Sequence, residues 1–254
     1  MNQKWPDVLW IVRHGESAGN VARDAAVAAG LPLIDIDTRD VDVPLSDLGL
    51  QQSASLGRWF AALPAERRPT VVLSSPYLRA RETARIVRDR GGAAHDAGDT
   101  VIDERLREKE FGVLDRLTRQ GIVQRFPEQA ELRRLLGKFY HRPPGGESWC
   151  DVILRLRSAL DTITLHYCEE RVLIVCHQVI VLCLRYLIEC MTEDEILAID
   201  RAGDVANCSV TTYEFDPARG RQGQLVLTGY NFVAPLEEEG TPVTSEPDAP
   251  VGAK

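Results

Sequence analysis

The feature that most restricts the fold of this chain is the alternation of short apolar runs with helix-like segments. Residues 8–12, 70–73 and 172–175 are the clearest apolar runs, and residues 100–103 form a further candidate strand. The first three runs are each followed by a segment whose apolar residues recur at helical spacing. Alternation of this kind builds parallel strands that are joined by crossover helices. The sequence therefore predicts a three-layer α/β/α fold with a mostly parallel central sheet.

Capping and turn residues place the remaining elements. The signals are an N-cap at Ser46, a cap and first-turn proline at Ser75 and Pro76, a capping box over residues 148–151, a cap at Thr192, and alternating strands over residues 210–215 and 224–228. A helix that starts at Pro76 would carry Arg79 in its first turn, with its head reaching back toward the preceding strand. We expect the last two strands near the edge of the sheet.

Composition indicates one domain that is followed by a tail. The chain has 254 residues, of which 44% are hydrophobic, so it can bury a large core. No linker-like change in composition precedes Pro235. We therefore expect one domain over residues 1–234 and an acidic, proline-rich tail over residues 235–254 that lacks fixed structure. A tail that folds over the functional site is the alternative.

Charge and cysteine content narrow the class of protein. A net charge of −8 argues against a nucleic-acid partner, because nucleic-acid-binding domains carry a basic excess. The six cysteines show no metal-binding spacing, and no disulfide framework is needed in a chain of this length. The apolar run 179–188 contains Arg185 and is too short to span a bilayer. We expect a cytoplasmic protein without a membrane partner, a metal or another cofactor.

The first strand leads into Arg13-His14-Gly15-Glu16-Ser17, and a predicted helix over residues 18–29 follows. The carboxyl ends of parallel strands are where α/β folds bind ligands, and a helix N-terminus favours an anion. Arg13 adds a permanent cation beside His14, which is a candidate nucleophile. The motif therefore predicts a phosphate site that contains a nucleophile. Taken alone, Arg-His-Gly is also compatible with a structural histidine.

Other strand exits supply further candidate residues. Arg79 follows the second strand, Glu108 follows the third, and His177 follows the fourth. Each has an ordinary structural interpretation, such as an exposed helix arginine or a solvated glutamate. Because parallel strands end at one edge of a sheet, a shared anion site there explains all of them together.

These motifs resemble the histidine phosphatase superfamily, which includes the cofactor-dependent phosphoglycerate mutases and the fructose-2,6-bisphosphatases. The resemblance rests on RHGES with Asn20, SSPYLRARETA, LREKEFG and VCHQ, and it extends from about Val8 to about Glu214. The segments PPGGESWCDVILRL and VLIVCHQVIVLCLRYLIE are most similar to the bisphosphatase domain of the bifunctional fructose-2,6-bisphosphate enzymes.

The resemblance implies a role for each residue of the set. His14 would attack phosphorus and become a phosphohistidine, while Arg13, Arg79 and His177 would hold the phosphate oxygens. Glu108 would serve as the general acid and then as the general base. Asn20 would donate to a phosphate oxygen, and Gln178 matches a substrate-contacting position of the bisphosphatases.

A basic inserted segment over residues 113–145 is the second candidate for substrate binding. It carries seven basic and three acidic residues and is closed by Pro143-Pro144-Gly145-Gly146. Arg134 and Lys138 stand at i and i+4 of a predicted helix, so they would share one face. They align with the basic pair that grips the sugar bisphosphate in the bisphosphatases. We expect them to hold a second anionic group of the substrate, although a solvated helix face is the ordinary alternative.

The sugar pocket of the bisphosphatases is otherwise altered. The family's arginine after the second catalytic histidine falls at Leu182, and two of its tyrosines fall at Trp149 and Arg119. The sequence therefore predicts a metal-independent phosphomonoester hydrolase that acts on a small phosphorylated metabolite, with fructose 2,6-bisphosphate as one candidate. The alternatives are a phosphoglycerate mutase and a catalytically inactive binding or regulatory relative.

Overall fold

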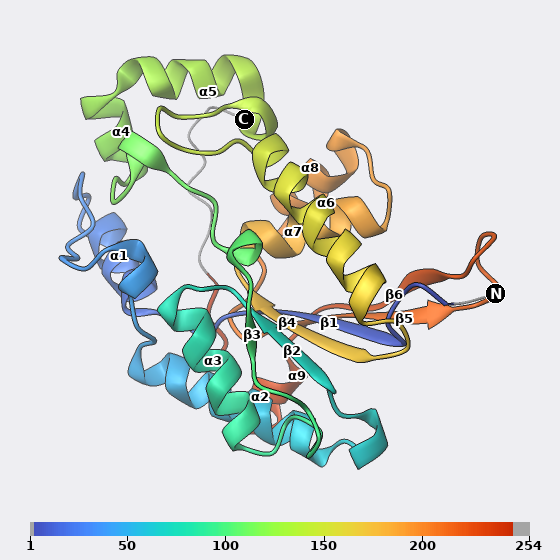
Figure 1. The fold of residues 1–254 in the computed structure, drawn as a ribbon. Helices are drawn as coiled ribbons and strands as arrows, with labels where there is room; N and C mark the ends of the chain where they lie inside the picture. The colour runs from blue at the N-terminus through green and yellow to red at the C-terminus, as the bar shows by residue number, and fades with distance from the viewer. Residues whose placement is uncertain (1–2, 246–254) are drawn as a thin grey trace.

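The computed structural model describes residues 3–245, which form an α/β/α sandwich around one sheet (Figure 1). The strands are β1 (Val8–Arg13), β2 (Val71–Ser74), β3 (Val101–Ile102), β4 (Arg171–Cys176), β5 (Val210–Asp216) and β6 (Gln224–Phe232). The helices are α1 (Ala18–Ala28), α2 (Asp47–Ala62), α3 (Leu78–Asp89), α4 (Arg119–Arg125), α5 (Pro127–Tyr140), α6 (Trp149–His166), α7 (Gln178–Ile188), α8 (Glu193–Ala202) and α9 (Ala234–Glu237).

The sheet confirms the predicted fold class. Its strand order is β3-β2-β4-β1-β5-β6, in which β1 to β4 run parallel and β5 and β6 are antiparallel additions. Only β6 lies at an edge of this part of the sheet, because β5 pairs with β1 as well as with β6. The prediction of two strands near the edge is thus correct for β6, whereas β5 is an interior strand.

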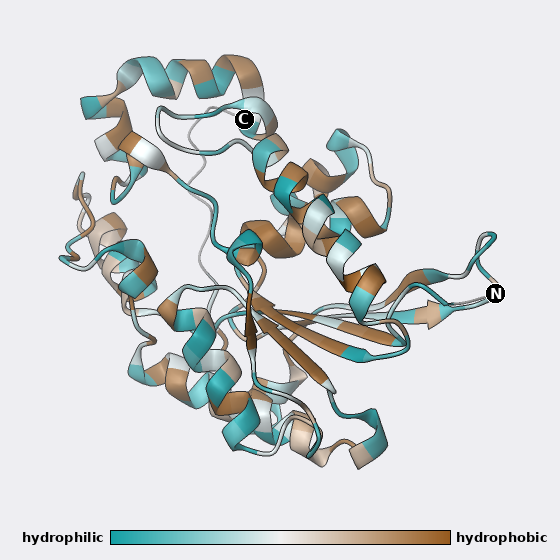
Figure 2. Ribbon diagram, viewed as in Figure 1, coloured by the Kyte–Doolittle hydropathy of each residue, from teal (hydrophilic) through white to brown (hydrophobic). Residues whose placement is uncertain are grey.

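The two central strands are apolar on both faces because helices cover both sides of the sheet. In β1, Leu9 and Ile11 belong to the core with α6 and α7, whereas Trp10 and Val12 face α2 and α3. The residues of β4 alternate in the same way. Figure 2 shows these strands as a hydrophobic centre between helices in which hydrophobic and hydrophilic residues alternate. This burial fixes the register, because a shift by one residue would exchange the two faces.

Most of the predicted caps are present. Ser46, Ser148 and Thr192 accept backbone hydrogen bonds at the starts of α2, α6 and α8. The prediction for α3 is wrong: the helix begins at Leu78 with Tyr77 as its cap residue. Ser75 instead continues the strand, since its N–H donates to the Val175 carbonyl, and its hydroxyl contacts His177.

The tail also differs from its prediction. Residues 235–245 were expected to lack structure, but Leu236 in α9 is fully buried beside α2. The segment after α9 then follows α2, where Arg58 forms an ion pair with Glu239 at 2.9 Å. One buried leucine and this polar pairing explain why an acidic, proline-containing segment takes a defined path. Residues 246–254, the rest of the predicted tail, lie outside the described residues.

Candidate active site

One cavity opens at the carboxyl ends of the parallel strands and collects the predicted catalytic residues. Arg13, His14, Arg79 and Glu108 line it. His177 lies immediately behind them, and its ring centroid is 5.0 Å from that of His14. The topology therefore brings the exits of β1, β2 and β4 and the segment after β3 to a single site.

His14 is held as a neutral imidazole with a defined orientation. Its side chain is buried, and its Nδ1 lies 2.7 Å from the Gly15 carbonyl oxygen. Because a carbonyl can only accept, Nδ1 must carry the proton, so the lone pair resides on Nε2. Burial lowers the pKa of His14 well below its ordinary value, and the positive charges of Arg79 and Arg13 lower it further. The unprotonated Nε2 is the form that nucleophilic attack requires.

Gly15 allows the catalytic loop to pack against α2. A Cβ at this position would lie 2.6 Å from the Gly49 carbonyl oxygen and 2.9 Å from Ser53 Oγ. Any larger residue would therefore push the loop away from the helix.

Arg79 reaches back from α3 to the nucleophile, as predicted. Its Nε donates to His14 Nε2 at 3.2 Å. Its Nη1 donates to the Asp40 carboxylate at 2.8 Å and to the Asp40 carbonyl at 2.7 Å. Asp40 lies in a loop that carried no site prediction, because nothing in its local sequence indicates a partner on α3. It is an internal anion that binds the guanidinium where a phosphate would.

Arg13 and Gln178 belong to one buried hydrogen-bond network. Arg13 Nη1 donates to Gln178 Oε1 at 3.1 Å and to the Val205 carbonyl. Gln178 Nε2 donates to Asp204 at 2.8 Å. The network fixes the Arg13 guanidinium at the cavity wall, where Gln178 also lies.

His177 is fully buried, and its Nε2 forms a hydrogen bond with Ser75 Oγ at 2.8 Å. Among the described residues, Nδ1 has no hydrogen-bond partner, and it lies 3.7 Å from Glu108 Oε2. Burial lowers the pKa of His177 well below its ordinary value, and Arg79 adds to this effect. A ligand oxygen at this position would give the buried nitrogen the hydrogen bond that it lacks.

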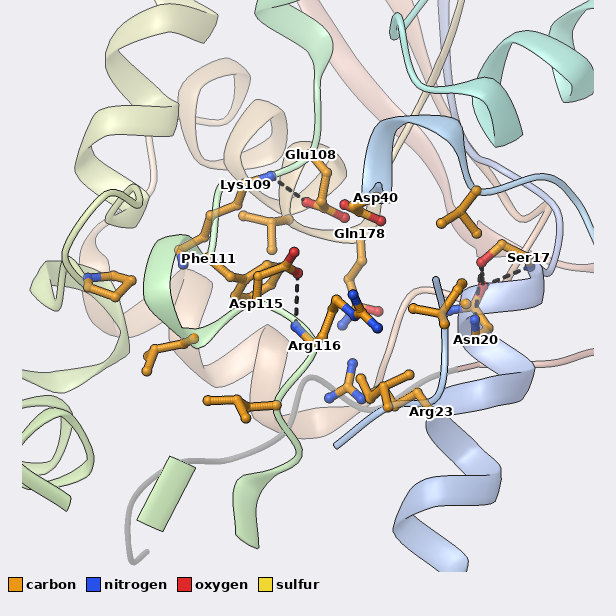
Figure 3. A pocket seen from close by; sticks show the side chains of 18 of the residues that line it. Ser17, Asn20, Arg23, Asp40, Glu108, Lys109, Phe111, Asp115, Arg116 and Gln178 are labelled. Carbon is orange, nitrogen blue, oxygen red and sulfur yellow. Dashed lines mark hydrogen bonds between the residues drawn. The ribbon is translucent and has the colours of Figure 1, made fainter. Parts of the chain in front are cut away.

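Glu108, rather than Glu110, faces the cavity (Figure 3). The Glu108 side chain is 14% exposed, and its Oε1 accepts the Lys109 N–H at 2.7 Å. Glu110 instead accepts the Tyr77 hydroxyl at 3.1 Å, and it does not line the cavity. Tyr77 was not predicted as a site residue, yet its ring packs against both His177 and Arg79.

Asn20 lies in the first turn of α1 and lines the cavity (Figure 3). Its Oδ1 accepts from the N–H and the hydroxyl of Ser17, each at 2.9 Å, which completes a capping box. The helix start therefore faces the site, as the sequence indicated. The donation from Asn20 to a phosphate oxygen stays a prediction.

The proposed pair Arg134 and Lys138 does not share a helix face. Gly137 has φ 78° and ψ 165°, which breaks the helical geometry of α5 between them. Arg134 is exposed, pairs with Glu131 at 2.6 Å, and does not line the cavity. The break removes Arg134 from the face of Lys138, and Arg134 points away from the cavity that its neighbour Arg133 lines, so the predicted pair does not form.

Lys138 does line the cavity, but its charge is paired. Its ammonium lies 2.8 Å from Asp200 on α8 and 5.3 Å from the centre of the Trp149 ring. Asp200 belongs to another helix, so helical spacing around Lys138 gives no sign of this partner. Of the altered family positions, Trp149 forms part of the cavity wall, Leu182 is buried in the core, and Arg119 lies outside the cavity.

The cavity wall also contains residues that were not predicted. They include the basic residues Arg23, Lys109, Arg116 and Arg133, together with Asp115, His141 and the apolar side chains Ile34, Ile36, Leu114, Leu117 and Ile122. Burial lowers the pKa of His141 to about 4, with contributions from Arg133 and Lys109. Arg23 stands three positions after Asn20, and that helical spacing is the one signal that could have identified it. The others come from loops and from α4 and α5, whose positions depend on the tertiary fold.

The chain belongs to the histidine phosphatase superfamily (branch 1), whose family model matches residues 9–227. It is 31% identical over 176 residues to a probable fructose-2,6-bisphosphatase of Schizosaccharomyces pombe, which covers 69% of this chain and 36% of the relative. It is also 31% identical over 166 residues to a phosphoglycerate mutase-like protein of Arabidopsis thaliana, which covers 62% of this chain and 53% of the relative. The chain thus spans about a third to a half of these relatives.

Solved structures share the fold. Bacillus stearothermophilus YhfR superposes with a TM-score of 0.67 at 27% identity, covering 90% of this chain and 98% of that chain. A mycobacterial glucosyl-3-phosphoglycerate phosphatase in complex with inorganic phosphate gives a TM-score of 0.66 at 22% identity, covering 90% and 99%. None of the helices between residues 3 and 245 has the length and apolar character needed to cross a membrane. Within the same residues, no cluster of three His, Cys, Asp or Glu could hold a metal ion.

Proposed function

We propose that this chain is a metal-independent phosphomonoesterase that works through a phosphohistidine at His14. The observation that carries the proposal is the state of that imidazole: Nδ1 is engaged by the Gly15 carbonyl, and Nε2 lies 3.2 Å from Arg79 Nε at the cavity wall. A neutral nucleophile beside two arginines is suited to attack an anion whose charge those arginines neutralise.

The reaction has two half-reactions. In the first, His14 Nε2 forms a bond to phosphorus while the bond to the leaving oxygen breaks, and Glu108 gives that oxygen a proton. In the second, water attacks phosphorus, Glu108 takes the water proton, and the bond to Nε2 breaks. The same carboxyl group can serve both steps because the first leaves it deprotonated and the second returns the proton. Arg13, Arg79 and His177 would hold the other phosphate oxygens.

Substrate binding would exchange partners on Arg79. Its guanidinium is shared between His14 and Asp40 in this structure, so a phosphate must replace at least part of the Asp40 contact. Asp40 would then serve to hold Arg79 in place when the site is empty. Because one anionic partner of Arg79 replaces another, the free-energy cost of this exchange is small.

We further propose that the substrate carries a second anionic group and an apolar portion. The cavity wall extends beyond the catalytic residues, since Arg23 and Arg116 line it together with the apolar side chains Ile34, Ile36 and Leu117. Asp115 lines it as well and accepts the Arg116 N–H at 2.9 Å. The second-anion site predicted for Arg134 and Lys138 is thus better placed at Arg23 and Arg116, with Lys138 on the adjoining wall. A sugar bisphosphate such as fructose 2,6-bisphosphate remains one candidate, in view of the fission-yeast relative.

A phosphoglycerate mutase is the second candidate, because the Arabidopsis relative is described as phosphoglycerate mutase-like. A mutase would form the same phosphohistidine but return the phosphoryl group to a retained product. The two activities therefore differ in whether water or a second hydroxyl accepts the group.

A panel of phosphorylated metabolites, assayed for both phosphate release and mutase turnover, tests these proposals. We expect phosphate release from doubly anionic substrates. Arg116→Gln should raise KM for those substrates about tenfold or more while sparing an aryl phosphate, since a charge-assisted contact contributes about 1.5–3 kcal/mol. Arg134→Gln is the matched control and should change KM for neither the doubly anionic substrates nor the aryl phosphate. If no phosphate ester is turned over, the chain is an inactive relative. Equal effects of the two variants would remove the second-anion site.

A further inference from the structure

One peptide unit, together with Arg79, fixes the orientation of the His14 ring. The carbonyl of that unit is the Gly15 oxygen, which lies 2.7 Å from His14 Nδ1. Its N–H belongs to Glu16 and donates to Gln52 Oε1 at 2.8 Å. Any rotation of this peptide would therefore move the group that fixes both the proton and the plane of the imidazole.

Gln52 connects this peptide to the C-terminal segment. Its side chain is fully buried, and its Nε2 donates to the Pro242 carbonyl at 3.0 Å and to Thr244 Oγ1 at 2.9 Å. The partners fix the amide orientation, because the Glu16 N–H can only donate and the Pro242 carbonyl can only accept. Residues 190 positions apart in the chain are thereby joined across one side chain.

A second connection reaches the other side of the same loop. Asn207 Nδ2 donates to the His14 carbonyl at 3.0 Å, and Asn207 is buried. Thr244 binds this residue twice: its hydroxyl donates to Asn207 Oδ1 at 3.1 Å, and its carbonyl accepts the Asn207 N–H at 2.8 Å. The Thr244 hydroxyl therefore accepts from Gln52 and donates to Asn207, so it serves both connections.

The segment is itself anchored to α2 on the way from α9. Thr241 Oγ1 lies 2.8 Å from Ser55 Oγ, and Glu239 pairs with Arg58. Leu236 is fully buried in the core below the sheet. The threonine hydroxyl at position 244 thus stands on a fixed support and is not the end of a loose tail.

We propose that Thr241, Pro242 and Thr244 form a clamp that holds the catalytic loop, with Thr244 as a positioning residue that acts through Gln52 and Asn207. The clamp lies behind the loop and does not touch the substrate cavity. Its catalytic consequence rests on the proposed function of His14, whereas its effect on the loop does not. The clamp aims Nε2 by restricting the Gly15–Glu16 peptide, so it should act on turnover more than on substrate binding.

The test compares Thr244→Val with Thr244→Ser and Val243→Ala. Valine keeps the shape but removes the hydroxyl, serine keeps the hydroxyl, and Val243 is an exposed neighbour without a contact to the loop. The measurements are kcat and KM for p-nitrophenyl phosphate and the hydrogen-exchange rate of the Glu16 amide. Loss of one net hydrogen bond corresponds to about a two- to tenfold change in a rate or equilibrium constant. We expect Thr244→Val to lower kcat by about that factor with little change in KM, and to speed Glu16 exchange. The other two variants should match the wild type.

Three results would overturn the proposal. Thr244→Val could keep both wild-type kcat and wild-type Glu16 exchange, Thr244→Ser could be as impaired as the valine variant, or the loss could appear in KM alone. The exchange measurement needs no substrate. If the wild type fails to hydrolyse any phosphate ester, the proposed function fails, but Glu16 exchange in the three variants still decides whether the clamp exists.

Discussion

Acid should destabilise this protein through its two buried active-site histidines. His14 and His177 are both buried as neutral rings, and burial lowers the pKa of each well below the ordinary value of a histidine. When the chain unfolds in acid, each ring binds a proton that it does not bind in the folded state. The unfolded state therefore binds more protons, and the stability that these residues contribute is complete above pH 6.5 and is lost as the pH falls.

The size of the effect follows from proton linkage. Between pH 7 and pH 5, a ring that stays neutral when folded and has an ordinary pKa when unfolded lowers the free energy of unfolding by at most about 2 kcal/mol. The two rings together account for at most about 4 kcal/mol, a large part of a typical stability of about 5–15 kcal/mol. Carboxylates also titrate in acid, so the wild type alone cannot isolate this contribution.

Urea unfolding of the wild type, His14→Gln and His177→Gln at both pH values separates the histidines from the carboxylates. Each variant should lose about 2 kcal/mol of the pH-dependent change, because the carboxylate contributions cancel in the difference. The buffers must lack phosphate, since an anion that binds the folded state would add stability of its own. If both variants keep the full wild-type pH dependence, the histidines are not held neutral and the reasoning about the nucleophile is wrong.

Three further predictions concern the chemistry. Glu108→Gln should reduce turnover of an alkyl phosphate by about 10²–10⁴ and of an aryl phosphate by less, because the aryl leaving group needs less protonation; the reverse pattern in Glu110→Gln would exchange the two assignments. Asp40→Asn should lower the inhibition constant of vanadate by about fivefold, since it removes a charge of like sign at a partly exposed position while keeping an acceptor for Arg79; weaker inhibition would mean that Asp40 mainly orders Arg79. Chelator should leave activity unchanged, because the guanidinium groups of Arg13 and Arg79 supply the positive charge. Rescue of a lost activity by a divalent ion would place the protein in another class.

The sequence was sufficient for the fold because the relevant signals are local. Val8–Arg13 and Arg171–Cys176 are apolar on both faces, and this pattern occurs in parallel strands that helices cover on both sides. The strand exits then place Arg13, His14, Arg79 and Glu108 at one cavity, as expected from parallel topology. The helix caps could also be predicted from local sequence, since a cap depends on residues three positions away. These caps are Ser46, Ser148 and Thr192.

Features that depend on distant partners could not be predicted in this way. Lys138 finds Asp200 on another helix, and Arg79 finds Asp40 in a loop. The break at Gly137 depends on a backbone conformation that glycine permits but does not require. Residues 235–245 have the composition of a disordered tail, and their order comes from contacts with α2 and with Asn207.

The most direct test of the account is to trap the phosphoryl group. The protein should be mixed briefly with ³²P-labelled substrate, quenched in alkali, digested and analysed for a labelled peptide. We predict an acid-labile, base-stable label on the peptide that contains His14, absent from His14→Ala, whose turnover should fall to background. Full turnover in His14→Ala, or a label on any other residue, would contradict the phosphohistidine mechanism.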